Sequence, residues 1–182
     1  ALPISKILLT LLALTPLVAC TDKAPAGPDD QAVLALGIQG AVLVEPQLIS
    51  SGQYDEAQFS ELPALGYRTV IQLRPATEDG TGWEEAKADE VGLNVIRIPV
   101  DGVQGVTEAN ARKLEAALKN RDGGTLVACG SGNRVGALFA LKAYYCEELP
   151  AEEALEAGKQ AGLTRAEPAV RTLLGLPEAD SE

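Results

Sequence analysis

The chain of 182 residues contains no histidine and only three cysteines. The absence of histidine excludes Ser-His-Asp triads, Cys-His nucleophile pairs and the usual metal sites built on imidazole. Three cysteines are too few for a four-cysteine zinc ribbon. We therefore expect neither a metal nor another cofactor, and any catalysis has to depend on other side chains.

Positive charge is also scarce, because 15 Lys and Arg residues stand against 26 Asp and Glu residues, for a net charge of −11. An acidic chain without a basic patch is a poor candidate for nucleic-acid binding. The same net charge repels phosphorylated ligands at long range, so an anion site in this chain would depend on local groups.

The hydrophobic run near the start, residues 7–19, is too short to cross a bilayer, which takes about 20 residues, but it suits the core of a signal peptide. Leu17-Val18-Ala19-Cys20 resembles the lipobox of bacterial lipoproteins. We expect residues 1–19 to be the signal peptide and Cys20 to carry the lipid. Because Thr21 rather than Asp follows, the resemblance favours the outer membrane, facing the periplasm. The alternative is an ordinary secretory signal.

Composition then divides the rest of the chain. Residues 20–40 are rich in Pro, Gly, Ala and Asp, which predicts a flexible tether after the lipidated cysteine. Residues 41–176 are long enough for one domain with a sizeable core, and residues 177–182 form an acidic tail. We find no internal repeat that would indicate a second domain.

Strand and helix patterns alternate along this domain. The predicted strands are 41–44, 47–50, 68–73, 94–98 and 125–128, and the predicted helices are 55–64, 82–90, 107–119, 135–147 and 151–161. Thr164 and Glu167 have the spacing of a capping box for a last helix. The alternation predicts an α/β fold, with a mostly parallel sheet flanked by helices on both faces.

The segment most informative about chemistry is Cys129-Gly130-Ser131-Gly132-Asn133-Arg134, between a predicted strand and a predicted helix. Backbone N–H groups and a helix dipole converge at such a turn and favour an anion. They also favour a thiolate at the cysteine, and the planar arginine fork matches two phosphate oxygens. We expect Cys146 to lie roughly 18 Å along the helix, too far for a disulfide with Cys129.

The loop resembles the signature of the protein tyrosine and dual-specificity phosphatases. Residues 42–163 are similar to a small bacterial branch of that superfamily, whose domains also occur fused to beta-lactamase-like hydrolases and NAD kinases. The resemblance includes residues 49–53, 65–74 and 98–102, and Gly136-Ala137-Leu138 behind the loop. It implies a phosphomonoester hydrolase with a phosphocysteine intermediate, acting on a phosphoprotein or small phosphoester. The oligomeric state stays open.

Three departures from the wider superfamily leave two alternatives open. The loop has one residue fewer than usual, a length typical of rhodanese-like sulfurtransferases. Ala128 stands where the superfamily has a supporting histidine, and Val135 stands where many relatives have a hydroxyl that assists sulfur departure. A catalytically weak or inactive anion-binding module and a sulfurtransferase are therefore the alternatives.

A phosphatase of this kind needs a general acid. Asp101 is the candidate, because it follows a neighbouring parallel strand and the related phosphatases carry the acid in a comparable loop. Glu78 and Asp79 are weaker candidates in the other long loop. We expect Ser131 and Asn133 to order the phosphate-binding loop. Arg74 ends its strand near the same edge, and we expect it to form an ion pair inside the domain.

Overall fold

The computed structural model describes residues 27–178. The predicted signal peptide, the predicted lipidation site Cys20, most of the predicted tether and the last four residues of the tail lie outside this range. Among the described residues, no helix has both the length and the apolar character needed to cross a membrane.

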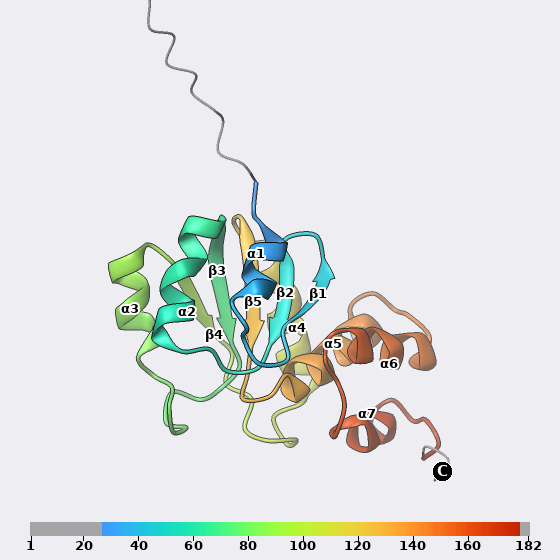
Figure 1. Cartoon of the computed structure of the whole chain (residues 1–182). Helices are drawn as coiled ribbons and strands as arrows, with labels where there is room; N and C mark the ends of the chain where they lie inside the picture. Colours follow the sequence, from blue (N-terminus) through green and yellow to red (C-terminus); the bar gives the residue numbers. More distant parts are fainter. Residues whose placement is uncertain (1–26, 179–182) are drawn as a thin grey trace, which may run out of the picture.

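A five-stranded sheet forms the centre of the domain (Figure 1). Its strands are β1 (Val42–Glu45), β2 (Leu48–Ser51), β3 (Tyr67–Gln72), β4 (Asn94–Arg97) and β5 (Gly124–Ala128), in the order β1-β2-β5-β3-β4. Only β1 runs antiparallel to its neighbour, and β2, β5, β3 and β4 are parallel. The predicted α/β class and the mostly parallel sheet are confirmed.

Helices cover both faces of the sheet (Figure 1). On one face lie α1 (Asp30–Ala35), α2 (Glu56–Glu61) with the 3₁₀ turn Leu62–Leu65, and α3 (Glu84–Val91). On the other lie α4 (Glu108–Lys119), α5 (Asn133–Tyr145), α6 (Ala151–Gln160) and α7 (Glu167–Leu173). Alternate strand residues supply two cores: Val70 and Leu126 face the first set of helices, Ile71 and Val127 the second.

The predicted tether is corrected at its C-terminal end. Residues 30–35 form α1 instead of flexible chain, and the Asp29 side chain caps this helix by accepting a hydrogen bond of 3.0 Å from the backbone N–H of Ala32. Val33 is fully buried, and the Tyr67 hydroxyl donates to Asp30 over 2.7 Å. Val33 and Asp30 thus attach this segment to the rest of the domain, through burial of the first and a hydrogen bond to the second.

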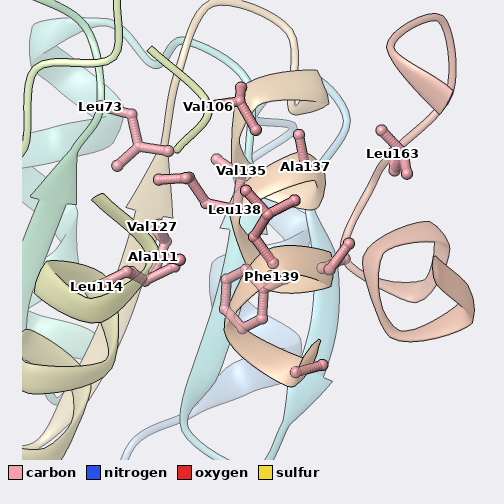
Figure 2. Close-up of a cluster of buried hydrophobic side chains, with 14 of the residues drawn as sticks. Leu73, Val106, Ala111, Leu114, Val127, Val135, Ala137, Leu138, Phe139 and Leu163 are labelled. Carbon is pink, nitrogen blue, oxygen red and sulfur yellow. The ribbon is translucent and has the colours of Figure 1, made fainter. Parts of the chain in front are cut away.

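Helix α5, which follows the cysteine loop, is the most buried helix of the domain. Its residues from Val135 to Ala143 are all buried, which is the pattern of a helix packed on several sides. Figure 2 shows Val135 and Leu138 of this helix among side chains from the sheet, α4 and the loop after α6. At the crossing with α6, a Cβ on Gly136 would lie only 2.2 Å from the backbone nitrogen of Leu163. The glycine therefore permits a close approach that holds the start of α5 in place.

Candidate active site

The four parallel strands end at one edge of the sheet, and the candidate site is built from the residues that follow these ends. β2 leads to Gly52, β3 to Arg74, β4 to the loop of residues 98–106, and β5 to Cys129. The carboxyl ends of parallel strands share an edge by construction. Cys129 and the loop with Asp101 therefore lie on the same side of the domain.

Cys129 is almost completely buried, with 1% of its surface exposed. Its sulfur accepts a hydrogen bond of 3.1 Å from the backbone N–H of Gly132. Its own N–H donates to the carbonyl of Ser51 over 3.2 Å, and the carbonyl of Gly130 accepts from the N–H of Gln53 over 3.3 Å. The end of β2 and the residues after it thus anchor the loop on one side, and the N–H of Gly132 binds the sulfur.

The loop passes directly into α5. Gly132 has a left-handed backbone, with a φ of 83°, and α5 begins at Asn133, two residues earlier than the sequence pattern predicted. Glycine adopts that conformation without the steric cost of a side chain. The early start places Arg134 in the first turn of the helix, where the first backbone N–H groups lack an intrahelical partner.

The Arg134 guanidinium is turned back over this loop and is held on two sides. Its Nη1 and Nη2 atoms donate to the two carboxylate oxygens of Glu78, each over 2.8 Å, and Nη1 also donates to the carbonyl of Val100 over 3.0 Å. A Cβ on residue 130 would lie 3.2 Å from Nη2, so the guanidinium covers Gly130. The pKa of Arg134 is raised above its usual value, first by Glu78, with a smaller contribution from Cys129.

Glu78, one of the weaker general-acid candidates from the sequence, is bound by two arginines. Its carboxylate accepts hydrogen bonds from Arg134 and, over 2.8 Å, from Nε of Arg74. The bonds from Arg134, assisted by Arg74, lower the pKa of Glu78 to about 2 against the opposing effect of partial burial. Because Arg134 and Arg74 occupy both of its oxygens, this carboxylate is suited to orienting an arginine rather than to protonating a leaving group.

Arg74 forms the ion pair inside the domain that the sequence predicted. Only 8% of the residue is exposed. Besides Glu78, its guanidinium donates to the side-chain oxygen of Gln53 over 2.8 Å and to the carbonyl of Asp79. These partners leave Arg74 as part of the support for Glu78 rather than as a group that faces a ligand.

Asp101 lies in the loop after β4, next to the residue whose carbonyl binds Arg134. The side chain is exposed, and no hydrogen bond or ion pair to another residue in the range 27–178 involves its carboxylate. The loop itself turns tightly, because the N–H of Gly105 donates to the Asp101 carbonyl over 3.0 Å. Asp101 is therefore a free carboxyl group on the same sheet edge as the sulfur.

Asn133 links the loop after Cys129 to the segment between α6 and α7. Its side-chain oxygen accepts from the N–H of Thr164 over 3.0 Å, from the Thr164 hydroxyl over 3.1 Å and from the N–H of Ala166 over 3.0 Å. The predicted capping box of Thr164 is thus wrong: Ala166 is the N-cap of α7, without a side-chain cap bond. The Thr164 hydroxyl donates to Asn133, 31 residues away, instead of capping the helix that contains Glu167. Ser131 accepts a long hydrogen bond of 3.5 Å from Asn133.

The two flanking residues that depart from the superfamily are core residues here. Ala128 and Val135 are both fully buried, and they belong to the clusters on opposite faces of the sheet. Neither offers a polar atom to the loop. The loop is supported instead by backbone hydrogen bonds with Ser51 and Gln53.

A pocket of about 340 Å³ adjoins Arg134. It lies between the start of α5, the loop after β4 and the segment after α6. Apolar surface dominates its lining, which consists of Glu78, Gly102, Val103, Val106, Asn133, Arg134, Ala137 and Ala166. Figure 2 shows Val106 close to the first turns of α5, where Val135 and Ala137 lie.

Comparison with known proteins places this arrangement in a family. Residues 41–145 match the phosphatase-like domain of beta-lactamase hydrolase-like proteins. The match covers more than half of the chain, which therefore belongs to this family. The chain carries a phosphatase-like domain.

Two curated relatives show how much of a longer protein the chain resembles. The beta-lactamase hydrolase-like protein of Xylella fastidiosa (strain Temecula1) is 35% identical over 102 residues, which are 54% of this chain and 23% of the relative. The protein of that name in Agrobacterium fabrum (strain C58) is 30% identical over 105 residues, 56% of this chain and 24% of the relative. The chain thus spans about a quarter of the length of these relatives.

Solved structures share the fold. A DUF442 protein from Shewanella putrefaciens CN-32 superimposes with a TM-score of 0.58 at 22% identity, over 77% of this chain and 93% of that one. The core catalytic domain of the PP-IP phosphatase SIW14 from Saccharomyces cerevisiae gives a TM-score of 0.56 at 14% identity, over 79% and 88%. At these identities the likeness establishes the architecture alone.

Sequence reasoning missed the role of Glu78 as the partner of Arg134. The two residues are 56 positions apart, so no local spacing connects them. The signal that the sequence does contain is an acidic residue in a long loop directly after a buried strand. That signal identified Glu78 as a residue near the site but did not connect it with Arg134.

Proposed function

We propose that this chain is a cysteine-dependent phosphomonoester hydrolase. The observation that carries the proposal is the Cys129 sulfur, which accepts a loop N–H at the start of α5, beneath an arginine whose orientation Glu78 fixes. A phosphate placed on this loop would meet a nucleophile, backbone donors and a cation at once. The substrate would be a phosphoprotein or a small phosphoester.

The first step is an in-line displacement at phosphorus. The Cys129 thiolate forms an S–P bond while the bond from phosphorus to the leaving oxygen breaks, and the electron pair goes to that oxygen. Asp101 donates a proton to the leaving oxygen, so an alcohol departs. The N–H groups of residues 130–134 and the Arg134 guanidinium bind the equatorial oxygens.

The second step restores the enzyme. The Asp101 carboxylate takes a proton from water, whose oxygen attacks phosphorus, and the S–P bond breaks with its electron pair returning to sulfur as thiolate. Val135 supplies no hydroxyl to assist this departure. We therefore expect breakdown of the phosphocysteine to limit turnover, and a burst of leaving group should precede a slow steady state.

The decisive test uses the two cysteines of the described domain. Cys129→Ser should reduce hydrolysis of p-nitrophenyl phosphate under reducing conditions by more than about a thousandfold, as expected for loss of a nucleophile. Cys146→Ser is the matched control, because Cys146 is also a free thiol but ends α5, away from the loop. Equal activity of the two variants would contradict the proposal.

Other outcomes identify the alternatives. Binding of inorganic phosphate without turnover would indicate an anion-binding module, in keeping with the apolar residues Ala128 and Val135. Conversion of cyanide with thiosulfate as sulfur donor, lost in Cys129→Ser, would indicate a sulfurtransferase, in keeping with the short loop.

We propose further that the chain is a lipoprotein attached through Cys20 to the bacterial cell envelope, with the domain in the periplasm. The lipobox-like residues 17–20 and the composition of the segment after them support this. Metabolic labelling with a radioactive fatty acid should mark the wild type and not Cys20→Ala. Label retained by Cys20→Ala, or absent from both, would contradict the attachment.

A further inference from the structure

Glu84, the first residue of α3, is a fully buried carboxylate that the proposed reaction does not use. Four donors surround it: Nε2 of Gln72 at 3.0 Å, the Thr81 hydroxyl at 2.8 Å, the N–H of Gly82 at 2.6 Å and Nη2 of Arg97 at 3.0 Å. A buried charge is costly unless it is paired and hydrogen-bonded. Every donor here belongs to the loop before α3 or to a neighbouring strand.

One connection runs from Glu84 to Glu78 along the loop. The Thr81 hydroxyl donates to Glu84, while the backbone N–H of Thr81 donates to the carbonyl of Glu78 over 3.3 Å. Gly82 closes the turn with a φ of 92°, where a Cβ would lie 2.6 Å from the carbonyl oxygen of Ala76. Glu84 thus holds the end of the segment 75–82 that presents Glu78 to Arg134.

A second connection runs through two arginines. Arg97, which pairs with Glu84, donates from Nη1 to the carbonyl of Arg74 over 2.7 Å. Arg74 in turn donates from Nε to Glu78 over 2.8 Å. The first connection ends at the backbone of Glu78, and the second ends at its carboxylate, which orients Arg134.

Glu84 has the charge that these contacts require. Burial alone would raise the pKa of its carboxyl group, but the hydrogen bonds from Thr81, from backbone N–H groups and from Arg97 outweigh burial and lower the pKa. The group is therefore ionised at neutral pH and accepts all four bonds.

We infer that Glu84 is a positioning residue for Arg134, acting through the segment 75–82 and Glu78. The inference rests on the proposed function, because its consequence is a phosphate site with a correctly oriented arginine. Glu84 touches neither the sulfur loop nor Arg134 in the described structure, so its effect on binding has to pass through Glu78.

The test compares variants of two adjacent glutamates in the whole chain of 182 residues. Glu84→Gln places an amide group among donors, which should loosen the loop and raise both KM for p-nitrophenyl phosphate and Kd for inorganic phosphate about tenfold. Glu85→Gln is the matched control: Glu85 binds the same Arg97 at 2.6 Å, but its side chain is 46% exposed, and Arg97 is its side-chain partner in the described residues. We expect less than about a twofold change there.

A gentler pair of variants covers the case in which Glu84→Gln does not fold. Thr81→Val removes the hydroxyl at nearly constant volume and should raise Kd for phosphate severalfold, whereas Thr81→Ser should restore the wild-type value. A double-mutant cycle then tests the route. If Glu84 acts through Glu78, adding Glu84→Gln or Thr81→Val to Glu78→Gln should raise Kd no further.

The results separate failure of the inference from failure of the proposed function. Unchanged phosphate binding in folded Glu84→Gln and in Thr81→Val, or additive effects with Glu78→Gln, would overturn the inference while the wild type remains an active phosphatase. A wild type that neither hydrolyses p-nitrophenyl phosphate nor binds phosphate would overturn the proposed function and, with it, the inference.

Discussion

The two loops that flank Arg134 hold their carboxylates in different ways. Glu78 is bound by two arginines, and its loop is fastened to the buried Glu84. Asp101 is exposed in a loop whose contact with Arg134 is made by a backbone carbonyl, that of Val100. Both loops follow parallel strands at the same edge, so the difference arises from what the side chains meet.

This difference suits the two carboxylates to the separate tasks that we propose for them. A group that must exchange a proton with substrate and water has to be accessible to both, and Asp101 is exposed, without a side-chain hydrogen bond or ion pair within residues 27–178. A group that must hold a guanidinium has to remain ionised and immobile, which two arginines ensure for Glu78. Two carboxylates at one sheet edge can thus serve different purposes because their neighbouring groups differ.

The largest expected effect tests the free carboxylate. Asp101→Asn should lower kcat/KM for both p-nitrophenyl phosphate and phenyl phosphate, by about a hundredfold for the latter, because the leaving oxygen loses its proton donor in the first step. The loss should be greater for phenyl phosphate, whose leaving group is more basic. Phosphate affinity should be unchanged, and Asp89→Asn, on the exposed face of α3, serves as the control. Equal losses for both esters would remove Asp101 from the proton-transfer role.

A smaller effect of a different kind tests the bound carboxylate. Glu78→Gln should raise KM and the Kd for phosphate about tenfold, with little dependence on the leaving group, because a misplaced arginine weakens anion binding. Glu108→Gln is matched to it, since Glu108 also pairs with an arginine, Arg112 at 2.7 Å, on the surface of α4. If Glu78→Gln instead altered leaving-group dependence, the two loops would have exchanged roles.

The smallest effect is on acid stability. The pKa of Glu78 is about 2 in the folded chain against 4.5 for an unperturbed carboxyl group, so the folded state binds this proton less readily than the unfolded state. Its contribution to stability is present above about pH 4.5 and is lost as the pH falls toward 2. The difference in urea midpoint between wild type and Glu78→Gln should therefore shrink between pH 6 and pH 3. A constant difference would contradict the lowered pKa.

Local pattern was sufficient for most of the architecture. The strands at β3, β4 and β5 and the helices α4 and α6 were predicted to within a few residues, because buried strands and amphipathic helices have periodicities that depend only on near neighbours. The first residues of α3 and α5 were each predicted two positions away from where the structure places them. Helix α1 was missed because a short apolar segment after Pro and Gly has the composition of a tether until its burial is known.

The candidate site also has features that the local sequence predicts and features that depend on distant residues. Cys129, Gly132 and Arg134 are neighbours in the sequence, and the strand–loop–helix turn that holds them has a local signature, as does the position of Asp101 after a strand. The predicted cap at Thr164 was wrong because Asn133 competes for the same groups from a distant segment. Residue spacing near Thr164 does not reveal this competition, because Asn133 is 31 residues away.

The sequence by itself determined the fold class and the loop that presents sulfur and arginine to an anion. The tertiary structure alone decided which carboxylate holds Arg134 and which stays free. The physical reason is that the pKa and orientation of a side chain depend on the charges and donors within a few ångströms. For Glu78 those groups include Arg134, 56 residues further along the chain.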